Sequence, residues 1–396
     1  MEHTTQVELI QRVLGYMDSG KTHQAESVTY NPVSMYTSRD VLAKEQEVLF
    51  RRHPQVVGFS AQLQGPGDYF THDLTGVPML VVRGRDGQVN AFLNVCRHRG
   101  ARVAEGCGQG VKTWACPYHA WSYDTAGKLV GIPDAYGFAG MERDAHGLVR
   151  LPVAEHLGLI WVNPTPGAEM DIASYAAPLA PDLTSYGLER WAYLDGRVMT
   201  RRINWKMVND TFWEAYHVKF LHKNTIAPLF MRNMITFDKL GRHHRMIGIK
   251  PGLEAFREQP QDQWNLLPYG TILYGVFPNT VLIYQQDHVQ LFSSYPDGND
   301  PDSCVMQLQI LIPEPIKSES AARHWQNNIE LLLNTVAEDF GVGEGIQRGF
   351  HSGANEYVTY GRFEPALDHF HTMLKQALGI PQTAPRHAPL SNPRAS

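Results

Sequence analysis

Apolar and polar residues follow three successive patterns along the chain, and each pattern predicts a different kind of structure. Near the N-terminus, apolar residues recur at intervals of three and four, the period of an amphipathic helix. These residues are Val7, Ile10, Val13, Leu14 and Met17. A second helix, DVLAKEQEVLFRR, follows a turn-rich stretch in which Thr37 or Ser38 is the expected N-cap. Residues 1–45 are therefore predicted to be a helical segment that packs on the last domain.

From residue 46 to residue 160 the pattern changes to short β-like runs broken by Gly, Pro and Asp. Residues 85–88 (RDGQ) lie between MLVVRG and VNAFLNV and are typical of a hairpin turn. Residues 124–127 (DTAG) give a second turn signal. We therefore expect an all-β domain over residues 46–160.

After residue 161, helical patterns alternate with strand-like runs such as TILYGVF, TVLIYQQD and VMQLQILIPE. A long helical segment, SESAARHWQNNIELLLNTVAEDFGVGEGIQRGF, follows them. Mixed strands and long helices predict an α+β domain over residues 161–380. Residues 381–396 are rich in Pro and Ala and are expected to form a loose tail.

Composition narrows the class of protein. The 396 residues are 43% hydrophobic and 19% charged, which is typical of a globular protein of two or three domains. The net charge of −5 shows no basic excess, so no nucleic-acid partner is expected. There is no run of about 18 apolar residues, so no membrane span is expected. The first 20 residues lack the pattern of a signal peptide, and we expect a cytoplasmic protein.

Cysteine and histidine occur together in two short motifs, CxH and CxxH. The motifs are Cys96-Arg97-His98 and Cys116-Pro117-Tyr118-His119. Two thiolates and two imidazoles are the ligand set of a Rieske [2Fe–2S] centre. The same four side chains are also able to hold a structural zinc, whereas a composition without secreted character disfavours a disulfide. Cys107 and Cys304 have no partner at ligand spacing and are expected to be buried thiols.

A second metal site is indicated by EAYHVKFLH, in which His217 and His222 are five residues apart. Two histidines and a carboxylate form the facial triad of non-haem Fe(II) oxygenases. In an ideal helix these two side chains would point about 140° apart. The helix must therefore distort, for example by a π-bulge, or end between them. For an isolated HxxxxH the ordinary alternative is two half-buried histidines on an amphipathic helix.

The flanking sequences NVCRHRG and WACPYHAWSYD, and the pattern from Asn204 to His222, resemble the ring-hydroxylating oxygenase family. The resemblance covers about residues 45–160 and 200–360. It implies the catalytic α subunit of a Rieske non-haem iron oxygenase, with a β-rich Rieske domain inserted in a helix-grip (START-like) antiparallel-sheet catalytic domain. It assigns the CxH and CxxH motifs to the [2Fe–2S] cluster. It assigns His217, His222 and Asp339 to a mononuclear Fe(II), with Glu338 as the alternative carboxylate.

Two acidic residues before His217 are further candidates for catalysis. The resemblance implies that Glu214 bridges an iron-ligand histidine to a cluster-ligand histidine of a neighbouring subunit. Many family members have Asp there, and Glu is similar to the subset that oxidises quaternary-ammonium compounds such as carnitine and glycine betaine. Asp210 stands where many relatives have Asn.

The resemblance also implies which side chains line a substrate pocket. They are Met207, Phe212, Phe220, Phe277, Asn279, Tyr284 and His288. For most of them, aromatic core packing is the ordinary alternative. Residues 243–245 (HHR) are expected to lie in an exposed loop.

The implied function is that of a terminal oxygenase component that hydroxylates a small organic, aromatic substrate by mono- or dioxygenation. The alternative is a monooxygenase or N-demethylase of a quaternary-ammonium or other alkyl substrate. No nicotinamide or flavin fingerprint is found, so electrons are expected from an NAD(P)H-dependent reductase, with or without a ferredoxin. A homotrimer or a multiple of one is implied, and a small β subunit is left open. A pure electron carrier and a zinc-binding structural protein are the rival classes.

Overall fold

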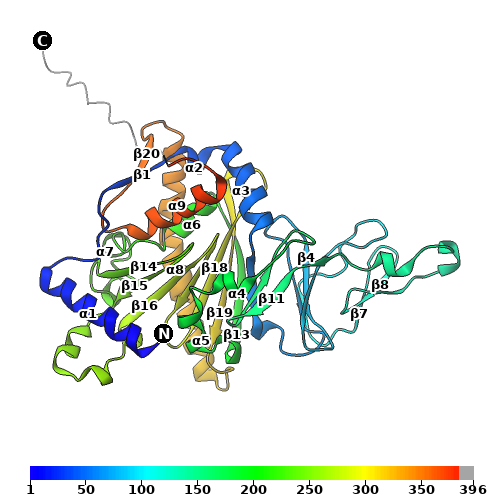
Figure 1. Ribbon diagram of the computed structural model, residues 1–396, viewed down its shortest axis with the longest axis horizontal. Coiled ribbons are helices and arrows are strands. Elements are labelled where there is room, and N and C mark those ends of the chain that lie inside the picture. Colours follow the sequence, from blue (N-terminus) through cyan, green and yellow to red (C-terminus); the bar gives the residue numbers. More distant parts are fainter. Residues whose placement is uncertain (383–396) are drawn as a thin grey trace, which may run out of the picture.

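The computed structural model describes residues 1–382, and the rest of the predicted tail, residues 383–396, lies outside the described part. Figure 1 shows a large body built from a sheet and helices, with a smaller β-rich part at one side. The chain begins in the large body, passes through the smaller part and then returns. No helix within residues 1–382 is long and apolar enough to cross a membrane.

The smaller part contains a five-stranded and a three-stranded antiparallel sheet. The five-stranded sheet has the order β10-β5-β4-β3-β6, and the other has the order β7-β8-β9. The bounds are β3 (Tyr69–His72), β4 (Met79–Arg83), β5 (Val89–Leu93), β6 (Cys107–Gly108), β7 (Thr113–Ala115), β8 (Ser122–Asp124), β9 (Leu129–Gly131) and β10 (Arg150–Leu151). The turns expected from RDGQ and DTAG connect β4 to β5 and β8 to β9.

A third sheet, β11-β12-β2, connects the two parts. Its strands are β2 (Gln55–Phe59), β11 (Val153–His156) and β12 (Leu159–Val162). Successive side chains of a strand point to opposite faces. Accordingly Leu159 and Trp161 pack in the core of the large body, whereas Ile160 and Val162 pack against the smaller part. This sheet therefore belongs to both cores at once.

The large body is built on a seven-stranded antiparallel sheet of order β13-β19-β18-β17-β16-β15-β14. The bounds are β13 (Ala192–Arg201), β14 (Ile235–Leu240), β15 (His243–Ile249), β16 (Gly270–Val276), β17 (Thr280–Tyr284), β18 (Val289–Asp297) and β19 (Asp300–Ile312). Strands β15 to β17 are buried along their whole length. Their side chains alternate between two cores, with Leu273 and Ile283 in one and Tyr274 and Leu282 in the other.

Helices cover both faces of this sheet, which explains why its central strands are apolar on both sides. The long helix α8 (Glu319–Phe350) and helices α6 (Trp205–Asp210) and α9 (Pro365–Leu378) pack on one face. Helices α1 (His3–Ser19) and α5 (Ala180–Tyr186) pack on the other. The remaining elements near the termini are α2 (Ser34–Thr37), α3 (Arg39–Arg52), α4 (Ile172–Ala176) and the strand pair β1 (Thr29–Pro32) and β20 (Tyr357–Tyr360). The α+β class with an antiparallel catalytic sheet is confirmed.

The structure refines one local expectation and overturns two. Ser38 rather than Thr37 caps α3, because its side chain accepts a hydrogen bond from the Val41 backbone N–H (3.3 Å). Residues 243–245 are not an exposed loop but the buried start of β15. Their burial is tolerated because Arg245 pairs with Asp182 and Asp238. Cys107 is exposed on the short strand β6 and is not a buried thiol, whereas Cys304 is buried.

A fully buried ion pair fixes α6 to α3. Lys206 Nζ lies 2.7 Å from Glu45 Oε1, and neither side chain is exposed. Trp205 Nε1 donates to the other carboxylate oxygen (2.8 Å). The Lys206→Met substitution would leave a buried carboxylate without its counter-charge, and we expect a loss of about 3–5 kcal/mol in the free energy of unfolding.

Chemical denaturation followed by circular dichroism checks this expectation. Lys317→Met is the matched control, because Lys317 pairs with Glu314 at the exposed surface, where ion pairs contribute little. Equal midpoints for the two variants would show that the buried pair does not stabilise the fold.

Candidate metal centres and substrate cavity

Two loops of the smaller part present the CxH and CxxH motifs, and the loops have the same backbone hydrogen bonds. In the first, the Cys96 N–H donates to Ala101 O and the Gly100 N–H donates to Cys96 O. In the second, the Cys116 N–H donates to Trp121 O and the Ala120 N–H donates to Cys116 O. Gly100 and Ala120 each have positive φ, at 84° and 55°, which closes both turns tightly. The equivalent geometry holds the two motifs side by side.

The two histidines of these loops leave ring nitrogens free for a ligand, beside two thiols. The rings of His98 and His119 have centroids 4.6 Å apart. Their Nδ1 atoms are buried and have no hydrogen-bond partner among the described residues. Cys96 and Cys116 are buried thiols. Buried polar atoms normally have partners, so two orphaned imidazole nitrogens beside two thiols fit a cluster held by two sulfurs and two nitrogens.

Two aromatic side chains support this site. The ring of His98 stacks on Trp121 with centroids 4.8 Å apart and planes at 9°. Tyr123 Oη lies 3.3 Å from Cys96 Sγ and accepts from the Arg97 N–H (3.0 Å). Tyr123 thus contacts both the sulfur and the backbone of the CxH motif.

His217 and His222 flank a single helical turn. Helix α6 ends at Asp210, and α7 (Val218–Leu221) begins after His217 and ends before His222. Of the two alternatives, a distorted helix or a helix that ends, the structure has the second, with a short helix that ends before His222 and no π-bulge between the two histidines. With each histidine at one end of a four-residue turn, the side chains are released from the helical direction that would separate them.

The two histidines meet Asp339, which lies on α8. His222 Nε2 is 2.9 Å and His217 Nε2 is 3.3 Å from Asp339 Oδ1. The three ligand atoms lie within 4.8 Å of one another. Two imidazoles and one carboxylate, with the rest of the coordination sphere open to a cavity, are the donor set of a facial triad.

Two further carboxylates hold the other nitrogens of these histidines. Glu338 Oε2 is 2.6 Å from His222 Nδ1 and also accepts from Thr225 Oγ1 (2.9 Å). Glu214 contacts His217 Nδ1 and accepts from the His217 backbone N–H (3.0 Å). Each imidazole thus has a carboxylate at Nδ1 and turns Nε2 towards Asp339, an arrangement that fixes the tautomer of a metal ligand. It puts Glu338 on the side of His222 away from the triad, which favours Asp339 over Glu338 as the ligand.

The electrostatics of the triad follow from these contacts. Burial alone would lower the pKa of His217, but hydrogen bonds to Asp339 and Glu214 raise it to about 10. Burial likewise opposes the hydrogen bonds to Asp339 and Glu338 that raise the pKa of His222. Burial raises the pKa of Asp339, and its bonds to His217 and His222 lower it overall. Protons therefore occupy the site without metal, and metal binding must release them.

Comparison with known proteins identifies the family. Residues 53–142 match the Rieske [2Fe-2S] domain, and residues 188–380 match the ring hydroxylating alpha subunit (catalytic domain). The two matches together cover most of the chain. The chain belongs to the Rieske non-haem iron oxygenases. It is a catalytic α subunit of this family, which carries a Rieske [2Fe–2S] cluster and a mononuclear iron.

Relatives within the family differ in chemistry. Chlorobenzene dioxygenase subunit alpha from Cupriavidus sp. (strain PS12) is 35% identical over 190 residues, 46% of this chain and 42% of that subunit. Chloroplastic choline monooxygenase from Arabidopsis thaliana is 26% identical over 371 residues, 90% of this chain and 84% of that protein. The quaternary ammonium Rieske monooxygenase CntA, in complex with L-carnitine, shares the fold with a TM-score of 0.76. That match covers 88% of this chain and 95% of CntA at 21% identity.

In this oxygenase Asp210 does not contact the triad. It lies at the end of α6, where it accepts from Tyr36 Oη (2.5 Å) and pairs with His371 Nε2 (2.8 Å). Tyr36 also contacts Tyr360 Oη (2.9 Å). These contacts tie α6 to α2, β20 and α9, so Asp210 holds the segment before the triad rather than reaching into the site.

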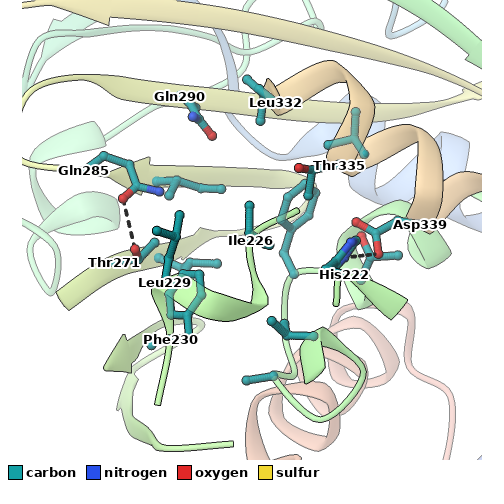
Figure 2. A pocket seen from close by; sticks show the side chains of 18 of the residues that line it. His222, Ile226, Leu229, Phe230, Thr271, Gln285, Gln290, Leu332, Thr335 and Asp339 are labelled. Atoms are coloured by element: carbon teal, nitrogen blue, oxygen red, sulfur yellow. Dashed lines mark hydrogen bonds and ion pairs between the residues drawn. The ribbon is translucent and has the colours of Figure 1, made fainter. Parts of the chain in front are cut away.

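A cavity of about 330 Å³ lies beside the triad, between α8 and the sheet face formed by β15, β16 and β17. Its lining includes Glu214, His217, His222 and Asp339 at one end. Figure 2 shows His222 and Asp339 on one side of the cavity and the polar side chains Thr271, Gln285 and Gln290 on the other. Apolar side chains lie between the two sides.

Of the seven residues predicted to line a substrate pocket, two lie in the lining of this cavity. These are Phe212 and His288. The other five are placed elsewhere. Met207 packs in the core beside Gly343, Phe277 packs on His53, Asn279 bonds the Ser294 backbone, Tyr284 stacks on Tyr186, and Phe220 is 61% exposed.

The alternation of side chains along β17 explains why Tyr284 does not line the cavity. Because Ile283 and Gln285 face the cavity, Tyr284 between them points to the opposite face. Thr271, Gln285 and Gln290 were not predicted. A polar side chain in an otherwise apolar, buried strand is an informative signal, and Gln290 in VQLFSSY offered it.

The contact of Glu338 with His222 gives a testable prediction for the mononuclear site. Replacing Glu338 with glutamine removes the carboxylate that orients His222, and we expect Fe(II) to bind roughly 10–100-fold more weakly. Anaerobic Fe(II) titration of the metal-depleted protein measures this. Glu330→Gln, on an exposed position of the same helix, should bind iron like the wild type. If Glu338→Gln lost all binding while Asp339→Asn kept it, Glu338 would be the ligand.

Proposed function

We propose that this α subunit oxygenates a small organic substrate held in the cavity beside His217, His222 and Asp339. The observation that carries the proposal is that the cavity opens directly onto the ligand atoms of the triad. Cys96, His98, Cys116 and His119 would hold the cluster. When bound, the cluster and the iron supply electrons and dioxygen activation.

The residues of the chain prepare this reaction in three ways. Glu214 and Glu338 hold the Nδ1 atoms of the two histidines, so that their Nε2 atoms face the metal position. Apolar side chains around that end, among them Phe212 and Ile226, exclude water from the reacting centre. The cavity walls orient the substrate, which supplies the proximity that such reactions need.

The apolar end favours an aromatic or other apolar group next to the iron. Apart from the two triad histidines, Phe212, Phe230 and His288 are the aromatic side chains of the cavity lining, and a closed aromatic cage around a quaternary ammonium uses several aromatic faces around one point. The alternative, oxidation of a quaternary-ammonium or other alkyl substrate, is supported by Glu214 and by the chemistry named for choline monooxygenase and CntA.

Turnover with candidate substrates tests both readings. The reconstituted enzyme should consume O₂ in the presence of an arene or aryl acid and yield a hydroxylated ring or side chain. Release of trimethylamine or formaldehyde from a quaternary amine would instead establish the alternative. If no compound of either class gave a substrate-dependent product, the proposal would be contradicted.

Electrons are proposed to come from a separate NAD(P)H-dependent reductase, with or without a ferredoxin, in the cytoplasm. Residues 341–345 (GVGEG), the nearest glycine cluster to a nucleotide fingerprint, lie inside α8 and not after a strand. This position does not fit dinucleotide binding.

We propose further that subunits assemble head to tail into a trimer or a multiple of it. Exposed aromatic side chains lie beside each metal site: Tyr118 next to His119, and Tyr216 and Phe220 next to His217. Such unlike surfaces pair in a closed ring. Inter-subunit electron transfer is named for a quaternary ammonium Rieske monooxygenase of similar fold.

Co-expression of two inactive variants tests this assembly. A Cys96→Ser subunit lacks a working cluster and a His217→Ala subunit lacks the iron. If electrons pass between subunits, mixed rings regain activity, because an intact cluster then neighbours an intact iron site. Transfer within one subunit would leave the mixture inactive.

A further inference from the structure

The cavity beside the triad has a second, polar end that the oxygenation chemistry does not use. Figure 2 shows Thr271, Gln285 and Gln290 at the side opposite His222 and Asp339. The side chains between the two ends are apolar. They include Ile226, Leu229, Phe230 and Leu332. A bound molecule that fills the cavity therefore meets apolar walls at the iron and polar groups at its distal end.

Strand pairing brings the polar side chains together. Lys250 follows β15 and continues the row of Met246 and Gly248 that faces the cavity. Thr271, at the start of β16, pairs with Gly248. Gln285 follows β17, the next strand in the sheet. The three side chains therefore lie on one face at the same edge of the cavity.

Their hydrogen bonds leave donors available. Gln285 Oε1 accepts from Thr271 Oγ1 (2.9 Å) and from Lys250 Nζ (3.5 Å). With its oxygen engaged by two donors, the Gln285 amide nitrogen remains free to donate into the cavity. Lys250 has further donor hydrogens, because an ammonium carries three.

The charge of Lys250 is not matched. The described residues place no carboxylate within ion-pair distance of its ammonium, although the side chain is half-buried. The nearest acid acting on it is Asp287, whose carboxylate is exposed and held by His288 Nδ1 (2.8 Å). A half-buried cation without a counter-charge is costly. Among the cavity residues Arg232 is exposed and adds a second positive charge.

We propose that Lys250, with the Gln285 amide, binds a carboxylate at the distal end of the substrate. The substrate is then an acid with an apolar body, whose carbon to be oxidised lies at the triad. Charge-assisted hydrogen bonds from an ammonium to a carboxylate are stronger than neutral ones. This inference rests on the proposed function, since it names the class of molecule that the same cavity accepts. Aryl acids and trimethylammonium carboxylates both carry the carboxylate that this site would bind.

Binding to the metal-loaded enzyme without O₂ tests the inference apart from turnover. Two matched pairs separate the carboxylate from the rest of the ligand: phenylacetate with phenylacetamide, and glycine betaine with choline. Calorimetry measures the binding. In at least one pair, the acid should bind about tenfold or more tightly than the matched compound that lacks the carboxylate. The pair that shows the preference distinguishes an aryl acid from a betaine.

Variants assign the preference to Lys250. Lys250→Met should abolish the acid preference, and Lys250→Arg should retain most of it. Gln285→Leu should also reduce the preference for the acid, independently of Lys250. Lys239→Met, at an exposed lysine of β14, should leave the preference unchanged. An unaltered cluster spectrum and iron content show that each variant is folded.

The outcomes separate this inference from the function on which it rests. Equal binding within both pairs, no binding of either acid, or a preference that survives in Lys250→Met would overturn the carboxylate site. A Lys250-dependent preference without any product once O₂ and reductant are added would support the carboxylate site and refute oxygenation of these acids.

Discussion

The His217→Ala variant is expected to lose all measurable turnover and about one iron per chain, while its cluster spectrum stays that of the wild type. Removing the His217 imidazole leaves only His222 and Asp339 as donors of a site that uses three. The cluster ligands lie on separate loops of the other domain and do not contact His217. Metal analysis, visible spectroscopy and product assays on the same preparation measure all three quantities.

His351→Ala is the matched control, because His351 pairs with Asp302 at the surface near the end of α8. It should keep its full iron content and activity. If His217→Ala also kept its third iron, the metal would be held elsewhere and the assignment of the triad would be wrong.

The Glu214→Ala variant, kept in excess Fe(II) to offset any weaker binding at His217, is expected to hold both metals but to stop electron delivery to the mononuclear site. Glu214 holds His217 at Nδ1 and is accessible from outside, with about 15% of its side chain exposed. It is thus positioned to join His217 to a histidine of a neighbouring subunit, as the family resemblance implies. In a single-turnover experiment the pre-reduced cluster should stay reduced after substrate and O₂ are added.

Two controls qualify the result. Glu214→Asp restores a carboxylate that many family members carry at this position, and it should recover part of the rate. Glu330→Ala, at an exposed position of α8, should transfer electrons normally. If Glu214→Ala reoxidises its cluster at the wild-type rate, Glu214 serves only to orient His217.

Local sequence patterns predicted the parts of the protein that depend on local geometry. Cys96 and Cys116 each begin a short turn whose backbone closes on itself, so the ligand spacing is visible in the sequence. The same holds for the hairpin turns and for the long helix α8. Asp339, in contrast, is more than a hundred residues from His222, and only the family resemblance connected them.

What the sequence left undetermined depends on tertiary packing. Residues 211–217, between α6 and α7, are not helical and interrupt what reads as one continuous helical pattern. Residues 243–245 read as a polar loop, but helices cover both faces of the sheet and Arg245 pairs with buried Asp182 and half-buried Asp238. The cavity lining could not be derived, because it depends on which face of each strand α8 covers. For that reason Lys250 and Gln285 were not predicted to line the cavity.

The content of iron and acid-labile sulfide in freshly purified protein shows whether one chain holds both metal centres. We expect about three irons and two sulfides per chain, with the red-brown visible spectrum of a Rieske cluster. Two irons that do not rise to three on addition of Fe(II) would indicate an electron carrier without a mononuclear site. A colourless protein containing zinc in place of iron and sulfide would show that neither iron centre exists.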